Sequence, residues 1–339
     1  MTVNLTRRER LLEILSWARP HDSEIERRFA REFLDSVPGM QADAFGNRWI
    51  DAGEAAPHVM WSCHIDTVAA KGQCQMLAFD SDSGVVSLAK GKPGMSLGAD
   101  DGVGVWMMLE MLKAGRPGRY VFHRGEEVGC LGSRHIADKE PQILDGIQIA
   151  IALDRAGERD IITHQLGART ASDEFAASFA AQVNARGFLD MRADDGGVYT
   201  DTNEYAGVVP ECTNISVGYH GQHGPRETLS VYFAEALLDE LMRLDVNALV
   251  VARDPAEIED DYWQQWEPRR TQRRGEYHGM EDMLDAIVEF PEVAREMLLD
   301  LGITPRDFED AVWDALDRDR DGDDRRASER DERKLSLMD

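Results

Sequence analysis

The stretch IQIAIAL (residues 147–153) is apolar at every position except Gln148, and Asp154 follows it at once. A strand with one solvated face alternates apolar and polar residues, whereas a strand that is apolar almost throughout is typical of a sheet covered on both faces. This stretch therefore predicts a central strand of a largely buried sheet.

Other short β-rich runs lie on either side of this stretch. They are NRWIDAG (47–53), HVMWSC (58–63), RYVFH (119–123), DIITH (160–164) and TNISVG (213–218). Helical stretches separate or flank them, over residues 7–17, 23–36, 104–115, 172–187 and 227–244. Alternating strands and helices predict an α/β fold, a three-layer sandwich in which helices cover both faces of a mixed, mostly parallel central sheet.

The composition excludes several classes of protein. The chain has 339 residues, 42% of them hydrophobic, which is enough for one sizeable α/β domain with an appendage or for two modest domains. Its net charge of −26 would repel a phosphate backbone, so we expect no nucleic acid partner. The four cysteines form no CxxC pair, and no stretch approaches the roughly 20 apolar residues of a membrane span. We therefore expect a cytoplasmic protein with reduced thiols and no membrane partner.

Polar side chains follow the predicted strands, at the sheet edge where α/β proteins gather their ligands. They are His64 and Asp66, Glu126 and Glu127, Asp154, and His220 and His223, with Asp100 and Asp101 in a loop that leads into a helix. A single histidine after a strand is more often a hydrogen-bonded structural residue than a metal ligand, so the inference rests on the whole set. Two histidines with three or four carboxylates suit zinc, with manganese or cobalt as substitutes. A carboxylate that bridges two ions would use all of these ligands.

The order of these motifs resembles a known superfamily. HID (64–66), GADD (98–101), EE (126–127) followed by GCLGS, a strand that ends in Asp154, and HGPRE (223–227) are similar to the motifs of the two-zinc exopeptidases. That superfamily includes the Aeromonas-type leucyl aminopeptidases, peptidase T and the desuccinylase-like carboxypeptidases. The resemblance covers roughly residues 40–245, and the 69 residues from Asp154 to His223 favour its compact form without a lid domain.

The resemblance implies a role for each metal ligand. One Zn²⁺ ion is expected to be held by His64 and Asp154, and a second by Glu127 and His223. Because the ligand in the GAxD pattern is the last residue, Asp101 is expected to bridge the two ions.

The resemblance also separates the two adjacent glutamates. Glu127 is expected to bind metal, while Glu126 remains free as the general base for a metal-bridged hydroxide. Asp66 is expected to orient His64 from behind.

Four further residues are candidates for contact with the substrate. His220 or Tyr219 would stabilise the oxyanion, Asp201 would lie at the wall of the pocket, and Arg155 would contact a charged end of the substrate.

The predicted reaction is hydrolysis of a peptide bond in small peptides, by an exopeptidase of the aminopeptidase type. A carboxypeptidase-like enzyme or an N-acyl amino-acid amidohydrolase stays open, because Arg155 or Arg226 could hold a terminal carboxylate. A non-catalytic metal-binding protein on the same scaffold is a second alternative. Glu126 argues against it, because a purely structural site has no use for a free carboxylate beside its ligands.

The acidity is concentrated near the carboxyl end. Residues 251–339 hold 27 acidic and 14 basic side chains, and so contribute half of the net charge of the chain. This predicts a catalytic domain over residues 1–250 and an acidic, mainly helical extension over residues 251–339 that ends in a charged, flexible tail.

Overall fold

The computed structural model describes residues 5–53, 57–89 and 96–256 of the chain. The helices and tail predicted for the acidic extension fall almost wholly beyond residue 256, outside the described residues. Among the residues that are described, no helix is both long and apolar enough to cross a membrane.

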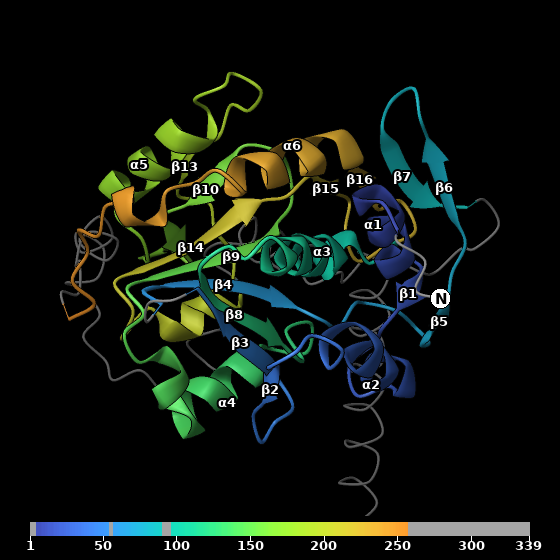
Figure 1. Cartoon of the computed structure of the whole chain (residues 1–339), viewed down its shortest axis with the longest axis horizontal. Coiled ribbons are helices and arrows are strands. Elements are labelled where there is room, and N and C mark those ends of the chain that lie inside the picture. Colours follow the sequence, from blue (N-terminus) through green and yellow to red (C-terminus); the bar gives the residue numbers. More distant parts are fainter. Residues whose placement is uncertain (1–4, 54–56, 90–95, 257–339) are drawn as a thin grey trace, which may run out of the picture. The chain divides into compact units, whose positions relative to one another are not determined.

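An eight-stranded sheet in the order β13-β10-β14-β9-β4-β8-β3-β2 forms the centre of this part of the chain (Figure 1). The four middle strands run parallel to one another; they are β14 (Glu211–Ser216), β9 (Ile149–Arg155), β4 (Val59–His64) and β8 (Gly118–His123). The outer strands are β13 (Arg192–Asp194), β10 (Asp160–Ile162), β3 (Arg48–Ala52) and β2 (Gln41–Ala42). Because β10 and β3 join the parallel block in the antiparallel sense, the predicted mixed, mostly parallel sheet is confirmed.

Helices cover both faces of the sheet. They are α1 (Arg7–Leu15), α2 (Glu24–Phe29), α3 (Ala99–Lys113), α4 (Leu131–Lys139), α5 (Asp173–Val183) and α6 (Val231–Leu241), with short helical turns η1 (Ala30–Leu34), η2 (Pro141–Leu144), η3 (Asp201–Tyr205) and η4 (Val246–Ala248). Residues of α1, α3, α5 and α6 share one hydrophobic core, while α4, η2 and η3 contribute to a second. Alternate residues of the middle strands divide between these two cores: Trp61 and Ile151 belong to the first, Met60 and Ala150 to the second. The period of two along each strand therefore produces the three layers.

Smaller antiparallel sheets surround the central one. The largest has the order β15-β16-β7-β6 and consists of β6 (Leu77–Asp80), β7 (Val85–Leu88), β15 (Tyr219–His220) and β16 (Thr228–Ser230). The two-stranded sheets pair β1 (Trp17–Ala18) with β5 (Gln73–Cys74), and β11 (His164–Gln165) with β12 (Ala168–Arg169). The sequence patterns predicted neither the four-stranded sheet nor α4.

The prediction of a helix over residues 227–244 is wrong at its amino-terminal end. Thr228–Ser230 form strand β16, which pairs with β7, and helix α6 begins only at Val231. Pairing with a distant strand decides the conformation here, because an edge of β7 is available to these residues.

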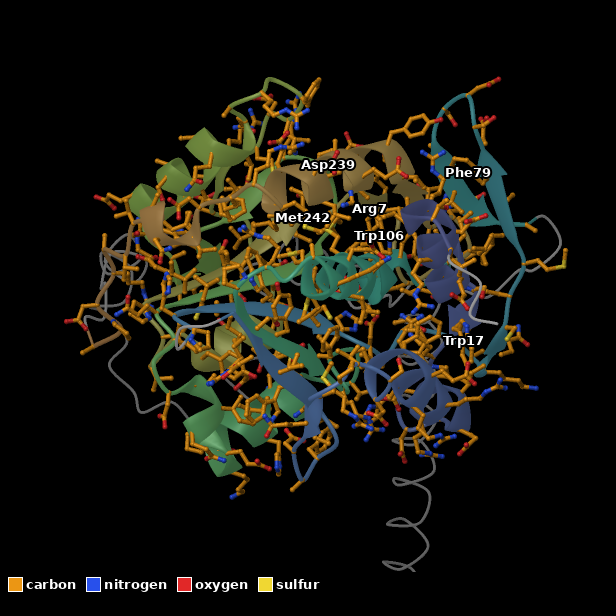
Figure 2. All side chains as sticks on the ribbon, viewed as in Figure 1. Arg7, Trp17, Phe79, Trp106, Asp239 and Met242 are labelled. Carbon is orange, nitrogen blue, oxygen red and sulfur yellow. The ribbon has the colours of Figure 1, made fainter. Side chains whose placement is uncertain are left out.

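Aromatic side chains support the amino-terminal helices; Trp17 and Trp106 are labelled in Figure 2. Trp106 of α3 is completely buried, and its indole N–H donates to the carbonyl of Arg7 at 2.8 Å, which ties α1 to α3. Trp17 packs edge-on against Phe29 and Phe33, at 5.9 and 5.7 Å between ring centroids. Helix α3 therefore has a rigid support, and its amino terminus points to the candidate site.

Candidate active site

The candidate site lies where β4, β8 and β9 end. These three strands are parallel neighbours, so the residues that close or follow them meet at one edge of the sheet. His64 is the last residue of β4, the loop with Glu126 and Glu127 follows β8, and Asp154 lies near the end of β9. The start of α3 and the loop between β15 and β16 complete the site.

Two groups of side chains with metal-binding atoms meet at Asp100. In the first group, His64 Nε2 lies 3.0 Å from Asp100 Oδ1 and 3.5 Å from Asp154 Oδ1. In the second, His223 Nε2 lies 3.1 Å from both Asp100 Oδ2 and Glu127 Oε2. Asp100 therefore offers one oxygen to each group, as a carboxylate that bridges two ions would.

The donor set fits a divalent transition metal. Each group combines one imidazole with two carboxylates, which suits zinc, manganese or cobalt. The second oxygen of Glu127, Oε1, is buried and has no hydrogen-bond partner among the residues that the structure describes. A buried carboxylate oxygen is normally satisfied by a donor, so this atom is consistent with a site made for a cation.

The expectation that Asp101 bridges the two groups is wrong by one residue. The Asp101 carboxylate is completely buried and accepts the backbone N–H of His64 at 3.2 Å and that of Gly104 at 2.9 Å. It therefore braces the end of β4 against the first turn of α3, while Asp100 faces the metal-binding atoms. Spacing could not separate the two residues, because the GADD stretch offers adjacent carboxylates and the backbone decides which one faces the site.

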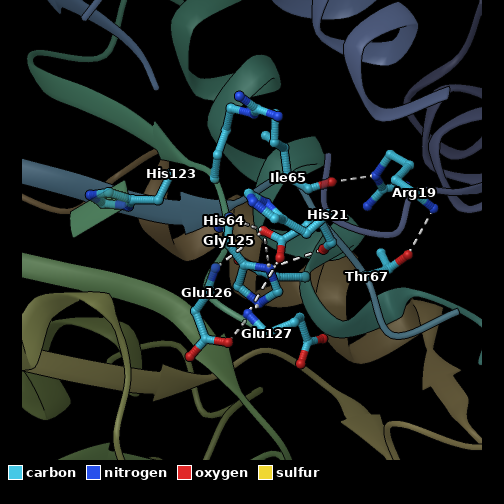
Figure 3. Close-up of polar contacts among 12 residues, drawn as sticks. Arg19, His21, His64, Ile65, Thr67, His123, Gly125, Glu126 and Glu127 are labelled. Carbon is cyan, nitrogen blue, oxygen red and sulfur yellow. Dashed lines mark hydrogen bonds and ion pairs between the residues drawn. The ribbon is translucent and has the colours of Figure 1, made fainter. Parts of the chain in front are cut away.

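The adjacent glutamates, shown with Gly125 in Figure 3, lie in a loop whose backbone is held by Asp66. The Asp66 carboxylate accepts the backbone N–H groups of Gly125, Glu126 and Glu127, at 2.8, 3.3 and 3.3 Å. The expected link from Asp66 to His64 also exists, but its backbone carbonyl makes it, at 3.0 Å from His64 Nδ1, while the carboxylate lies 3.7 Å away. Asp66 thus supports both the imidazole and the loop that presents the glutamates.

Glu126 and Glu127 face different partners. Glu127 belongs to the second group, whereas Glu126 Oε2 lies 4.0 Å from His64 Nε2 and belongs to neither group. Burial raises the pKa of Glu126 well above its usual value, and the charges of Asp154 and Glu127 add to this effect. The Cys130 thiol lies 3.7 Å from Glu126 Oε1 and stays protonated, because burial raises its pKa as well.

The surroundings of both imidazoles are strongly negative. Burial disfavours the charged form of His64, but Asp154 and Asp100 outweigh it and raise the pKa of His64 well above its usual value. Burial likewise opposes the charged form of His223, yet hydrogen bonds to Asp100 and Glu127 raise the pKa of His223 to about 11. Such surroundings stabilise positive charge, and a divalent cation would compete there with the ring protons.

Asp154 is held in place by neutral groups. The Tyr219 hydroxyl donates to Asp154 Oδ1 at 3.1 Å, and the Thr200 hydroxyl donates to Oδ2 at 2.9 Å. The side chain of Asn214, on the adjacent strand β14, bonds both the backbone N–H and the carbonyl of Asp154. The sequence suggests Tyr219 as an oxyanion donor, but in the structure its hydroxyl donates its hydrogen bond to Asp154, a candidate metal ligand.

The other substrate candidates lie away from the two groups. The His220 side chain is 54% exposed and lies 3.8 Å from Glu158. Arg155 donates to Asp160 at 3.3 Å and to the carbonyl of Gly196. Asp201 is buried and accepts a hydrogen bond from the Ser133 hydroxyl at 2.6 Å.

Sequence reasoning missed three contributors near the site. The motif pattern favours Asp101 over Asp100, and it assigns no role to His123 at the end of β8. For Glu227, the last residue of the HxxxE motif, the sequence gives only the spacing. Its side chain accepts the backbone N–H groups of Gly98 and Asp100, both at 3.0 Å.

Comparison with known proteins supports the relationship suggested by the motifs. Residues 50–201 match the family model described as Peptidase family M28. That range runs from β3 to the start of η3 and includes His64, Asp100, Glu127 and Asp154. No curated protein matches the chain in sequence.

Several solved structures share the fold at low sequence identity. The aminopeptidase PepT from Bacillus cereus ATCC 10987 has a TM-score of 0.54 and 14% identity, over 70% of this chain and 98% of that chain. A tripeptidase from Staphylococcus aureus subsp. aureus Mu50 has a TM-score of 0.57 and 14% identity, over 71% and 98%. The TET1 peptidase of Pyrococcus horikoshii, which can assemble into a tetrahedron or a large octahedral shell, has a TM-score of 0.51 and 16% identity, over 71% and 100%. These likenesses show the fold, and the match of residues 50–201 to a peptidase family agrees with the resemblance that the motifs suggest.

Proposed function

We propose that this chain is an aminopeptidase that acts on small peptides with two divalent metal ions; the match of residues 50–201 to the model of peptidase family M28 supports a hydrolase of the peptidase type. The position of Asp100 carries this proposal. Its two oxygens lie 3.0 Å from His64 Nε2 and 3.1 Å from His223 Nε2, so one carboxylate serves two groups. Zinc is the proposed metal, with manganese or cobalt as possible substitutes.

We propose that the residues of the two groups are metal ligands. His64 and Asp154 would hold one ion, Glu127 and His223 the other, and Asp100 would bridge them. The bound cations would supply Lewis-acid activation of water and of the substrate carbonyl.

Glu126 has the proposed role of general base. It lies beside His64 but outside both groups, so its carboxylate is available to the reactants. Burial raises its pKa, which suits a group that accepts a proton from water and then donates it to the leaving amine. The Cys130 thiol donates a hydrogen bond to Oε1 of Glu126, the oxygen that does not face His64, and so helps to hold the carboxylate in one orientation.

The contacts of the nearby arginines favour recognition of the amino end of a peptide, because a carboxypeptidase needs an arginine or lysine that is free to hold the terminal carboxylate. Of the two arginines that favour a carboxypeptidase, Arg155 is engaged with Asp160 and Gly196, and Arg226 is exposed on the loop that carries His223. A carboxypeptidase-like or N-acyl amino-acid amidohydrolase activity remains the alternative, with Arg226 as its recognition residue.

A substrate screen with metal-reconstituted protein tests the proposal. Aminoacyl anilides, dipeptides, tripeptides and N-acyl amino acids are incubated with the Zn²⁺, Mn²⁺ and Co²⁺ forms, and release of the amine is followed. Hydrolysis of free-amino substrates, lost when their amino group is acetylated, is the expected result. A preference for N-acyl substrates that Arg226→Ala abolishes would establish the alternative instead.

Replacement of Glu126 separates an enzyme from a metal-binding protein. Glu126→Gln should keep two ions per chain but lower kcat by about 100-fold or more, because the base is removed and every proposed ligand stays. Metal content and turnover are measured on the same preparation. Loss of one ion would show that Glu126 is a ligand, and full metal content without activity in the wild type would favour the non-catalytic alternative.

We also propose a cytoplasmic location. The four cysteines are unpaired, and three of them are buried, as is usual for proteins of a reducing compartment. Detection of the protein in fractions of its source cells tests this point.

A further inference from the structure

Glu227 is a buried carboxylate that lies next to the two metal-binding groups but belongs to neither. Glu227 is only 1% exposed and lies one position before strand β16. A buried carboxylate is costly unless hydrogen bonds or charges compensate it, so its partners indicate its role. Oε2 accepts the N–H of Gly98 and Oε1 accepts the N–H of Asp100.

These two N–H groups lie at the buried amino-terminal end of α3, where the N-cap residue makes no side-chain hydrogen bond. Gly98 is the N-cap of α3, has a left-handed backbone with φ of 70°, and lacks a side chain that could accept a hydrogen bond. A helix leaves its first backbone N–H groups without internal partners, and a side-chain oxygen at the N-cap normally accepts one of them. Glu227 performs this task from a distant part of the chain.

The peptide unit that Glu227 holds is the one that carries the shared carboxylate. Asp100 lies in a non-helical stretch at the start of α3, with φ of −82° and ψ of 103°. Its N–H is bonded to Glu227, and its two oxygens face His64 and His223. The hydrogen bond therefore acts on the backbone directly behind the side chain that both groups share.

The other end of the link is the loop that presents His223. This loop joins β15 to β16, and the strands pair Tyr219 with Leu229 and His220 with Thr228. His223 has a left-handed backbone with φ of 61°, and the N–H of Glu227 closes a turn on the carbonyl of Gly224 at 3.1 Å. The hydrogen bonds of Glu227 to the start of α3 therefore also hold the loop that contains His223.

We propose that Glu227 is a positioning residue that ties the loop carrying His223 to the backbone of Asp100, and so sets the distance between the two metal-binding groups. The proposal rests on the proposed function in one respect, since both assume that these groups bind metal. It adds a residue to the machinery that touches no metal and no substrate.

Glu211 provides a matched control for this role. It too is a completely buried carboxylate that accepts backbone N–H groups, from Ser172 at 2.6 Å, Ala252 at 2.8 Å and Arg253 at 3.0 Å. It lies at the first residue of β14, the opposite end of the strand from the site edge. Glu211→Gln should therefore disturb hydrogen bonds of the same kind without a connection to the metal-binding groups.

The test measures metal affinity and stability separately. Wild type, Glu227→Gln and Glu211→Gln are compared for Zn²⁺ affinity by competition with a chromophoric chelator, and for thermal unfolding of the metal-free protein. Both variants should unfold at lower temperature, because glutamine retains one acceptor oxygen where glutamate has two. Only Glu227→Gln should bind Zn²⁺ more weakly, by about 10- to 100-fold, as expected for loss of a group that orients a ligand.

The visible spectrum of the Co²⁺ form gives a second readout, because it reports ligand geometry and not stability. Glu227→Gln should change this spectrum, and Glu211→Gln should leave it as in the wild type. If Glu227→Gln does not fold, Glu227→Asp replaces it, since it keeps the charge and both acceptors but shortens the link by one methylene group.

Three outcomes would count against the proposal. Zn²⁺ affinity of Glu227→Gln within about twofold of the wild type would overturn it and leave the proposed function standing. An equal loss of affinity in Glu211→Gln would also overturn it, because the effect would then follow stability alone. A wild-type protein that binds no metal would overturn both this proposal and the proposed function.

Discussion

Asp100 and Asp101 are adjacent in the chain, but their carboxylates have different partners. Asp100 faces His64 and His223, while Asp101 accepts two backbone N–H groups and is shielded from solvent. Burial raises the pKa of Asp101 well above its usual value, and the charge of Asp154 adds to this, whereas both histidines lower the pKa of Asp100. The first carboxylate is therefore suited to bind metal and the second to support the fold.

Substitution by asparagine should separate these two roles. Asp100→Asn should strip both ions, since it removes a charged oxygen from each group. Asp101→Asn should keep two ions per chain and lower the melting temperature, because one of its two backbone donors loses its acceptor. Metal analysis after gel filtration, together with thermal unfolding, decides the matter. Retention of both ions in Asp100→Asn would restore Asp101 as the bridge.

Asp201 lies in a buried polar cluster below the site. His123 Nδ1 is 3.3 Å from its Oδ2, the Ser133 hydroxyl donates to its Oδ1, and the carboxylate of Asp66 and the imidazole of His64 act on it electrostatically. Burial raises the pKa of Asp201 to about 7 and lowers the pKa of His123 to about 3. Both side chains are therefore neutral in the folded protein at mildly acidic pH.

Asp201→Asn should make the stability of the metal-free protein less dependent on pH. The pKa of Asp201 is higher in the folded state than in the unfolded state, so the folded state binds more protons between about pH 4 and pH 7 and loses stability as the pH rises. At pH 8 this loss is complete, on the order of a few kcal/mol. The melting temperature of Asp201→Asn relative to the wild type should therefore increase from pH 4 to pH 8. A difference that stays constant with pH would show that Asp201 is ionised in the fold.

At the scale of elements, the hairpin of β15 and β16 is the part that completes the site. It supplies His223 to the second group, Tyr219 to Asp154, and Glu227 to the start of α3. The strand β16 is fastened to β7 by three residue pairs, so the hairpin is braced by a separate small sheet. The site thus depends on the docking of an element that is remote in sequence from the other ligands.

The two histidines of this hairpin should behave differently on replacement. His223→Asn should weaken binding of one ion by at least ~10-fold, because an imidazole ligand is lost while asparagine tolerates the left-handed backbone at this position. His220→Asn is the matched control, since His220 is exposed and faces Glu158. Zn²⁺ titration of both variants is the measurement, and equal affinities would exclude His223 as a ligand.

At the scale of the whole molecule, the first residues of the predicted extension pack on the catalytic part of the chain. The N–H groups of Ala252 and Arg253 donate to Glu211, and the Arg253 guanidinium donates to the carbonyls of Ala206, Val209 and Pro210. A boundary at residue 250 would therefore separate Ala252 and Arg253 from Glu211, to which their N–H groups donate. We place the end of the catalytic part beyond Arg253.

Two truncations should show this difference. A chain of residues 1–256 should fold, bind two ions and hydrolyse peptides, since all proposed ligands lie between His64 and His223. A chain of residues 1–250 should melt at lower temperature, because the buried carboxylate of Glu211 loses two donors, at a cost of about 1–3 kcal/mol. Unfolding, metal content and activity are compared with the full chain. A 1–256 chain that binds metal but is inactive would assign part of the substrate pocket to the extension.

The sequence alone is enough to predict the layers of the fold and to group most of the side chains that meet at the candidate site. Apolar strands such as 147–153 need cover on both faces, and parallel neighbours bring the residues after them to one edge, so the order of residues along the chain already groups His64, Glu127 and Asp154. The motif spacing adds His223. These inferences depend on short-range patterns and on rules that hold for every parallel sheet, and the structure brings the four side chains to one edge as expected, while their roles as ligands stay a prediction.

Tertiary structure alone decides which of two adjacent residues faces the candidate site, and which segment forms a strand. Asp100 takes the shared position because the backbone at the start of α3 turns it, and not Asp101, toward the histidines. Thr228–Ser230 form a strand because β7 offers them an edge, and Glu227 caps α3 because the hairpin brings it there. The physical reason is common to all three: side-chain direction and pairing depend on contacts between residues far apart in the chain, which no local pattern records.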